Sequence, residues 1–376
     1  MPDKHLHIIS FNIPYPANYG GVIDVYYKLK ALHKQGVKVH LHCFKYDREG
    51  NGKLASVCHK VHYYKRLTWP LAAFSLKPYI VSSRRSDELL KNLLKDDYPI
   101  LFEGLHSCYY IDHPKLKDRI KVYRESNIEH HYYFNLAKAE RNVLKKAYFL
   151  LASIKLKMYQ RVLEHAQLML TVSKADTKYL QTHFPHKRII HLPSFHPSDD
   201  FNILEGKGGY ALYHGNLSVP ENTIAAEFLA KEVFPGTQVP LILAGLNPPE
   251  TLKKIAGNGG NISLVANPSD EEMFDLIRNA QVNVLVTFQG TGLKLKLLNT
   301  LYNGRHVIVN KTILNGTGLD ELCTVRETAD TIRESTLNLF EKEFDQNELQ
   351  HRRKLLNGNY SNESNVKKLI EYIFGE

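Results

Sequence analysis

The sequence predicts an α/β protein made of two Rossmann-like, doubly wound domains in tandem. Short apolar runs alternate with helical patterns along most of the 376 residues, and this alternation implies parallel sheets covered on both faces. The alternation stops at PSFHPSDD, residues 193–200, and restarts after EGKGG, residues 205–209. Proline, serine and glycine at this density mark a linker, and the length suits two domains better than one core.

The first domain, residues 1–195, opens with a βαβ unit. A strand at Leu6–Ser10 leads through NIPYPANYGG into a helix at Val22–Gln35 and a second strand at Val37–Cys43. Gly20 and Gly21 occupy the first strand-to-helix turn, and their spacing differs from GxGxxG, which argues against a dinucleotide cofactor. The pair could serve only as a tight turn. Its place at the carboxyl end of a parallel strand favours a ligand-facing loop.

The rest of this domain alternates in the same way, with a helix at Asp87–Leu94. Further strands are expected at Lys60–Tyr64, Ile100–Phe102, Ile120–Tyr123, Leu168–Val172 and Ile189–Leu192. The longest helical pattern spans residues 135–166 and is strongly basic. Such a helix can make peripheral contact with an anionic membrane surface, or it can be a solvated helix packed along the domain, which we favour.

The second domain, residues 205–360, repeats the alternation. Strands are expected at Tyr210–Tyr213, Pro240–Ala244, Ile262–Val265, Val282–Val286, Val307–Val309 and Cys323–Val325. Helices are expected at Glu221–Glu232, Pro249–Ile255, Asp270–Asn279, Leu293–Asn303 and Thr328–Glu341. A last helix at Ser364–Ile373, within residues 361–376, is predicted to pack back on the first domain.

The stretch Phe288–Asn310 concentrates glycine and positive charge where a helix begins. Gly290 and Gly292 form the turn, and Lys294 and Lys296 lie in the first helical turn. Unpaired backbone amides and the helix dipole favour a phosphate at such a position. An ordinary βα connection with solvated lysines is the other interpretation.

Several polar, glycine-bearing loops fall at the carboxyl ends of predicted strands. In two doubly wound domains these ends face one cleft, where ligands bind. The loops are Gly20–Gly21, Glu103–His106, His214–Asn216, Ala244–Leu246 and Gly290–Lys296. Their shared edge is the strongest sign of a site that the residues alone provide.

Charge and composition narrow the class of partner. Lys and Arg outnumber Asp and Glu by ten (49 − 39), which suits an anionic partner. The 22 Tyr and 16 Phe follow no recognised RNA-binding motif, so nucleic acid is not expected. The four cysteines are scattered without a CxxC pair, no signal-peptide pattern opens the chain, and no apolar run reaches the ~18 residues of a membrane-spanning helix. We therefore expect a cytoplasmic protein, with attachment to the inner face of the membrane left open.

Four segments in order resemble a known family. They are PYPANYGG at 14–21, RESNIEH at 124–130, TVSKAD at 171–176 and GTGLKLKLLNTLYNGRHVIV at 290–309. Together they resemble the retaining nucleotide-sugar glycosyltransferases of the GT-B fold, of the bacterial family 4 type. The resemblance covers nearly the whole chain.

The resemblance implies a donor site in the second domain for a UDP- or GDP-linked sugar. Thr291 and Gly292 would offer amides to the diphosphate, Lys296 its charge, and Gly215, Asn216 and Gly245 further contacts, with Gly20 and Gly21 closing from the first domain. Fixed donors and a lysine can stabilise the departing diphosphate without a metal. No metal or cofactor is therefore expected, and the HxH pair at His40 and His42 is better explained by packing.

His106, Glu103 and Lys296 are the predicted catalytic residues. His106 would contact the sugar or the acceptor, with Glu103 beside it; a purely structural histidine is the alternative. Two positions depart from the family pattern. Asn299 stands where a glutamate commonly holds the ribose hydroxyls, although asparagine can still hydrogen-bond, and Ser126 stands where a histidine is usual.

The leading hypothesis is a retaining glycosyltransferase that moves a sugar from a nucleotide-sugar to a glycan or lipid-linked acceptor in cell-surface polysaccharide synthesis. Asn299 and Ser126 keep open a non-catalytic partner subunit with the GT-B fold. A sugar-nucleotide epimerase is a further alternative, because it shares the two-domain architecture.

Overall fold

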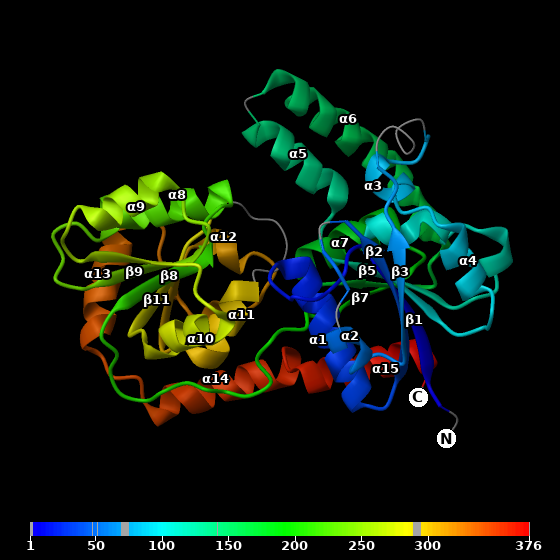
Figure 1. Ribbon diagram of the computed structural model, residues 1–376. Helices are drawn as coiled ribbons and strands as arrows, with labels where there is room; N and C mark the ends of the chain where they lie inside the picture. Colours follow the sequence, from blue (N-terminus) through cyan, green and yellow to red (C-terminus); the bar gives the residue numbers. More distant parts are fainter. Residues whose placement is uncertain are drawn as a thin grey trace. The chain divides into compact units, whose positions relative to one another are not determined.

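The computed structural model describes residues 3–46, 48–50, 52–68, 75–140, 142–288 and 295–375. These fall into two compact units, one running to Phe195 and resuming at Tyr360, the other from His196 to Asn359 (Figure 1). The predictions for Gly290, Thr291, Gly292 and Lys294 lie outside the described residues.

The first unit is built on a seven-stranded sheet in the order β3-β2-β1-β4-β5-β6-β7, with every pairing parallel. Its strands are β1 His5–Ser10, β2 Lys38–Lys45, β3 Lys60–Lys65, β4 Ile100–Glu103, β5 Lys121–Glu125, β6 Leu168–Thr171 and β7 Arg188–His191. The order runs outward in both directions from β1 and β4. Their carboxyl ends therefore flank a switch point, where open α/β sheets bind ligands.

Helices cover both faces of this sheet. They are α1 Gly20–Lys34, α2 Gly52–Ala55, α3 Tyr79–Ser82, α4 Asp87–Leu93, α5 Glu129–Ala139, α6 Val143–Tyr159, α7 Lys174–His183 and α15 Asn362–Phe374. One apolar core joins α1 and α15 to the sheet, with Val366, Leu369 and Ile373 buried in it. The C-terminal helix thus completes the first unit.

The predicted single helix over residues 135–166 is wrong, because the structure has a hairpin of two helices there. α5 ends at Ala139, where Glu140 takes an extended backbone, and α6 starts at Val143. The Asn142 side chain accepts a hydrogen bond from the Lys145 amide and so caps α6, which is the usual role of asparagine at this position. A 3-10 helix, Gln160–His165, follows.

The second unit has a six-stranded sheet in the order β10-β9-β8-β11-β12-β13, again parallel throughout. Its strands are β8 Ala211–Asn216, β9 Leu241–Leu246, β10 Ile262–Ala266, β11 Val282–Leu285, β12 His306–Val309 and β13 Thr324–Val325. Both sheets confirm the predicted doubly wound α/β class.

The helices of the second unit match the predicted pattern with two additions. They are α8 Pro220–Phe228, α9 Glu250–Gly257, α10 Asp270–Asn279, α11 Leu295–Asn303, α12 Lys311–Leu314, α13 Ala329–Glu341 and α14 Gln346–Asn359. α8 continues into a π-helical turn, Leu229–Val233. α12 and α14 were not predicted. α12 has only four residues. The α14 sequence, QNELQHRRKLLNGN, has few apolar residues, and only Leu349, Arg352 and Leu356 are buried.

Candidate active site

In the second unit, the loops after β8 and β9 meet because two glycines face each other. Gly215 and Gly245 are register partners at the carboxyl ends of these strands. A Cβ on Gly245 would lie 1.7 Å from the Gly215 carbonyl oxygen, far inside van der Waals contact. Gly245 is buried, whereas Gly215 and Asn216 are partly exposed. Gly245 therefore sets the close approach of the strands, and Gly215 and Asn216 are the partly exposed residues at this edge.

Lys296 lies in the first turn of α11 and is held towards the turn after β8. Its Nζ is 3.4 Å from Asn222 Oδ1 and 5.0 Å from the centre of the Tyr213 ring. The Asn222 Nδ2 in turn donates to the Asn216 carbonyl oxygen at 2.9 Å. The structure thus brings together Lys296 and Asn216, which were predicted to share a ligand, through Asn222, which sequence reasoning missed.

A neutral histidine, His214, lies near Lys296. His214 Nε2 is 2.9 Å from Thr300 Oγ1. Burial, together with the positive charge of Lys296, lowers the pKa of His214 to about 3. Thr287 donates to the Glu221 carboxylate at the start of α8. The Lys296 charge therefore lies beside neutral His214 and the Tyr213 ring, and the Glu221 carboxylate also acts on Tyr213, whose pKa is raised by burial and by this carboxylate.

Asn299, one helical turn further along α11, is engaged within its own unit. Its Oδ1 accepts hydrogen bonds from Ser198 Oγ at 3.1 Å and from Asn303 Nδ2 at 3.0 Å. The amide therefore ties α11 to the segment that enters the second unit. A contact between Asn299 and a ribose remains a prediction.

In the first unit, the structure brings Gly21 and His106 to the same aromatic ring at the switch point. A Cβ on Gly21 would lie 2.7 Å from Phe11 Cζ, and the His106 and Phe11 ring centres are 5.5 Å apart. α1 begins at Gly20, and Tyr19 before it provides no side-chain cap. The two loops that the sequence assigned to one edge of this sheet therefore do lie together.

His106 has an acidic neighbour that sequence reasoning quoted but did not select. His106 Nδ1, with no hydrogen-bond partner in the described part of the chain, lies 3.5 Å from Glu129 Oε1. Burial, with the charges of Arg84 and Arg66, lowers the pKa of His106 well below its usual value. Burial raises the pKa of Glu129 to about 8, against the effect of Arg84. At neutral pH the imidazole is neutral and can exchange hydrogen bonds with a hydroxyl group.

Glu103, predicted to contact sugar or acceptor, is instead paired inside the first unit. Its side chain is 3% exposed, and its Oε1 accepts from Lys28 Nζ at 2.6 Å. Lys28 also binds Asp24 at 3.0 Å, and Asp24 binds Arg124 at 3.2 Å. Burial would raise the pKa of Asp24, but Arg124 and Lys28 hold it at about 2. We call Asp24, Lys28, Glu103 and Arg124 the buried ion cluster.

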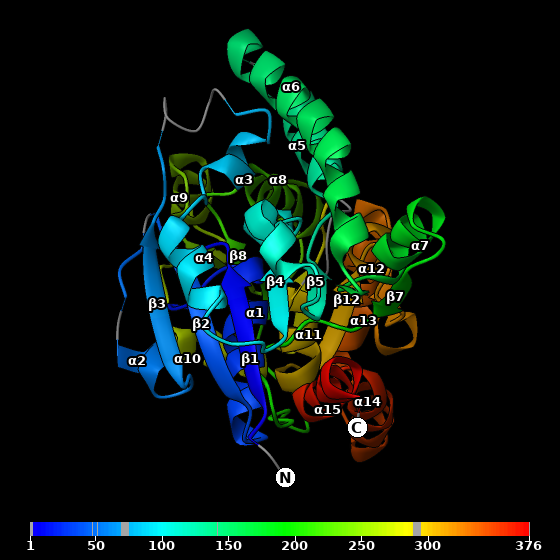
Figure 2. The same ribbon diagram turned by 90° about the vertical axis from the view of Figure 1, so that its right-hand side faces the viewer.

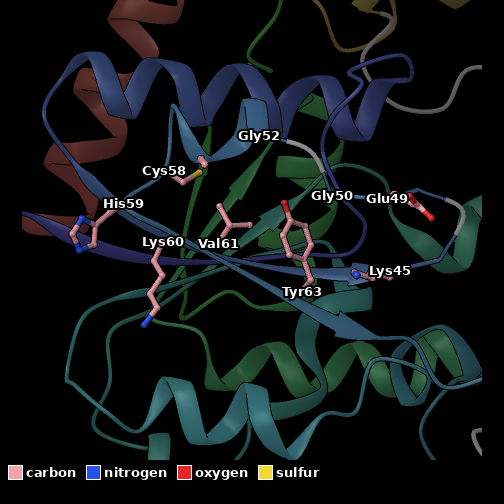
Figure 3. Close-up of a pocket in the computed structure, with 10 residues that line it drawn as sticks. Lys45, Glu49, Gly50, Gly52, Cys58, His59, Lys60, Val61 and Tyr63 are labelled. Carbon is pink, nitrogen blue, oxygen red and sulfur yellow. The ribbon is translucent and has the colours of Figure 1, made fainter.

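Two cavities lie away from these residues. One, of about 610 Å³, lies beside β3 and α2, with Cys58, Val61 and Tyr63 along its wall (Figure 3). The other, of about 620 Å³, is lined by Lys157, Met158 and residues of α7. None of the predicted site residues lines either cavity.

His40 and His42, the pair considered for a metal in the sequence, each lie within hydrogen-bond distance of a histidine of β1. His5 Nδ1 is 2.9 Å from His40 Nε2, and His7 Nδ1 is 2.8 Å from His42 Nε2. Among the described residues, no three His, Cys, Asp or Glu side chains are placed to hold a metal ion. No helix in the described ranges has the length and apolar character needed to cross a membrane.

Two parallel doubly wound sheets define the class of fold: it is that of the GT-B glycosyltransferases, as the resemblance implied. The alignment with the structure of TarM covers 99% of this chain and 99% of the TarM chain, with a TM-score of 0.69 and 10% sequence identity. A UDP-forming trehalose-phosphate synthase from Burkholderia xenovorans covers 99% of this chain and 100% of its own (TM-score 0.64, 10% identity). The alignment with sucrose-phosphate synthase from Thermosynechococcus elongatus covers 99% of this chain and 95% of the synthase chain (TM-score 0.59, 14% identity).

Sequence comparison adds one informative relative. An uncharacterized 44.6 kDa protein in a cps region of Klebsiella pneumoniae is 27% identical over 333 residues, which is 83% of this chain and 84% of that protein. No model of a known protein family matches the chain.

Proposed function

We propose that the protein is a retaining glycosyltransferase that takes a sugar from a UDP- or GDP-linked donor. The observation that carries the proposal is the position of Lys296. It lies at the start of α11, is oriented by Asn222 and Tyr213, and is joined through Asn222 to the carbonyl of Asn216 after β8. A cation beside partly exposed residues at the carboxyl edge of a doubly wound sheet suits a diphosphate.

Glycosyl transfer from a nucleotide-sugar requires stabilisation of the leaving nucleoside diphosphate. As the sugar–oxygen bond breaks, negative charge grows on the diphosphate, and the fixed Lys296 ammonium lowers the energy of that state. Thr291 and Gly292 are proposed amide donors to the same phosphates, and Gly215 and Asn216 donors from the other side. In this scheme the residues of the chain supply the charge stabilisation, and no metal is assigned a role.

We assign recognition of the sugar and acceptor to the first unit. Neutral His106, next to Glu129 and Phe11, can donate a hydrogen bond to a sugar hydroxyl or accept one from it. Gly20 and Gly21 open α1 at the same switch point. The acceptor proposed is a glycan or a lipid-linked sugar in capsular polysaccharide synthesis, a choice supported by the relative in a cps region.

One observation favours a second candidate, a non-catalytic partner subunit with the same fold. Asn299 replaces the carboxylate of the family pattern, and its amide oxygen is already bonded to Ser198 and Asn303. If Asn299 serves only to hold α11, the donor site lacks the ribose contact. Such a subunit would bind nucleotide weakly and turn over no donor.

The test is a panel of UDP- and GDP-sugars incubated with the purified protein. The glycosyltransferase proposal expects slow donor hydrolysis or transfer with at least one sugar, and a raised melting temperature with the matching nucleotide. Hydrolysis should disappear in Lys296→Ala and persist in Lys254→Ala, an exposed lysine of α9. If no donor is hydrolysed and neither nucleotide shifts the melting temperature, the proposal fails.

A further inference from the structure

The α5–α6 hairpin exposes an apolar stripe that the rest of the first unit, as far as the structure describes it, leaves uncovered. α5 and α6 lie side by side and reach beyond the strands of the first sheet (Figure 1, Figure 2). Leu144, Leu151 and Met158 recur every seven residues along α6, so they lie on one face. With Val143 and Ile154 they are between 58% and 82% exposed.

The opposite face of α6 is already used in packing. Ser153 and Leu156 are buried, and Ser153 Oγ donates to the His130 carbonyl of α5 at 2.7 Å. The Phe149 ring meets Tyr133 edge-on at 6.0 Å. A helix that is apolar on two opposite faces needs cover on both, and α5 with the rest of the unit supplies only one.

The charge of the hairpin decides what kind of cover fits. Residues 143–159, VLKKAYFLLASIKLKMY, contain four lysines and no acidic residue. Lys145, Lys146, Lys155 and Lys157 are all exposed. Lysine around an exposed stripe of leucine, isoleucine and methionine is the pattern of a helix that lies in the headgroup region of an anionic bilayer.

We propose that the exposed face of α6 docks the protein on a lipid bilayer that carries anionic headgroups. In this arrangement Leu144, Leu151, Ile154 and Met158 enter the boundary between headgroups and acyl chains, and the lysines contact lipid phosphates. α6 has 17 residues and so lies along about 25 Å of surface. The proposal rests on this surface alone and stands whether or not the donor chemistry is found.

The same charges argue against a second copy of the chain as the occupant. A two-fold contact through α6 places the same patch on both sides. The helix carries four lysines and no acidic residue, so the contact would bring lysines of the two copies together without an acidic partner on the helix, and such like-charge pairing is costly. The cavity of about 620 Å³ adjoins this surface, because Lys157 and Met158 line it together with Arg161 and Glu164.

The experiment is co-sedimentation of the full-length protein with vesicles of phosphatidylcholine alone, or with phosphatidylglycerol as about a third of the lipid. We expect binding to the anionic vesicles that is at least about ten-fold stronger and that weakens in high salt, because ionic screening shortens the reach of the lysines. Equal binding to both vesicles, or none to either, overturns the proposal.

Two pairs of variants separate the surface from general stickiness. Leu144→Ser with Leu151→Ser should lower binding by about ten-fold or more, whereas Leu94→Ser with Leu337→Ser, exposed leucines elsewhere, should not. Lys145→Gln with Lys155→Gln should lower binding by about ten-fold or more, whereas Lys178→Gln with Lys254→Gln should not. All of these side chains are exposed, so each variant should fold, and an unchanged melting temperature checks this.

A second measurement tests whether another copy of the chain, instead of lipid, covers the exposed face of α6. Analytical ultracentrifugation without lipid should give a sedimentation behaviour that is the same for the wild type and for the Leu144→Ser, Leu151→Ser variant. If instead the wild type is a dimer that this variant converts to a monomer, α6 is an interface between copies and the lipid proposal is wrong.

Discussion

The two units use positive charge in opposite ways. In the first, Lys28 is fully buried and saturated by two carboxylates, with Nζ at 2.6 Å from Glu103 and 3.0 Å from Asp24. In the second, Lys296 is partly exposed, makes a long 3.4 Å contact with Asn222, and lies 5.0 Å from the centre of the Tyr213 ring. A buried charge paired with two carboxylates holds helices to strands, whereas a partly exposed charge at a strand end can also contact an anionic ligand. The predictions below test this contrast.

The largest expected effect is on the buried ion cluster. Lys28→Met should lower the free energy of unfolding by about 3–5 kcal/mol, because it removes the lysine that binds the buried Glu103 carboxylate and leaves Asp24 with Arg124 alone. Lys296→Met should cost less than about 1 kcal/mol, as substitutions away from buried networks usually do. Urea unfolding of both variants measures this. Similar losses for the two lysines would contradict the contrast.

Next in size is the close contact that shapes the second site. Gly245→Ala should destabilise the protein by about 1–3 kcal/mol, because the new methyl group overlaps the Gly215 carbonyl and must push the strands apart. The matched control is Gly257→Ala at the end of α9, where a Cβ meets nothing within 4 Å. It should be neutral or stabilise by up to about 1 kcal/mol. Thermal unfolding that fails to separate the two alanine variants would argue against the close approach.

The sequence placed the strands well because buried parallel strands read as short apolar runs. Asp270–Asn279 was predicted with the bounds that the structure shows, since Ser269 and Glu272 form a capping box there and this signal is local. By contrast, the break between α5 and α6 depends on one asparagine cap inside a continuous helical pattern. α14 has too few apolar residues to show a period.

The site was predictable by loop position but not by side-chain partner. Gly21 and His106 meet at Phe11 as the switch point requires. The pairing of Glu103 with Lys28 joins residues 75 positions apart, and nothing in the local sequence reveals it. Asp24 and Lys28 did offer a signal, four residues apart on a helix face otherwise rich in valine and leucine. Asn222 became visible only once β8 and α11 were placed.

A third prediction concerns the histidines of the first sheet. Burial, together with nearby His7 and His5, lowers the pKa of His40 to about 4, and the pKa of His42 is lowered as well. A folded-state pKa below the unfolded value means that the unfolded chain binds more protons as the pH falls below about 6.5, so the free energy of unfolding decreases from there towards about pH 4.

Denaturant unfolding at several pH values between about 6.5 and 4 checks whether the free energy of unfolding falls on acidification. His40→Gln should make the free energy of unfolding fall less steeply with pH. The reason is that the variant lacks one histidine that is protonated in the unfolded chain but neutral in the fold. His33→Gln, at the exposed end of α1, serves as the control and should leave the slope unchanged. A stability that rises on acidification would contradict the arrangement.

The smallest effect is expected at Asn299. If this position contacts the ribose, Asn299→Glu should strengthen nucleotide binding by about five-fold, since a hydrogen bond to a charged group is worth roughly 1 kcal/mol more than one to a neutral group. Calorimetric titration with UDP and GDP measures it. Unchanged or weaker binding would support a purely structural role for the contacts with Ser198 and Asn303.

The central claim is that Lys296 belongs to a diphosphate site, and the dissociation constants of UDP and GDP test it most directly. Calorimetry on the wild type, Lys296→Ala and Lys254→Ala should show binding of at least one nucleotide. Lys296→Ala should weaken it by about ten- to a hundred-fold, the worth of a charged hydrogen bond, while Lys254→Ala leaves it unchanged. Equal dissociation constants for all three proteins would contradict the account.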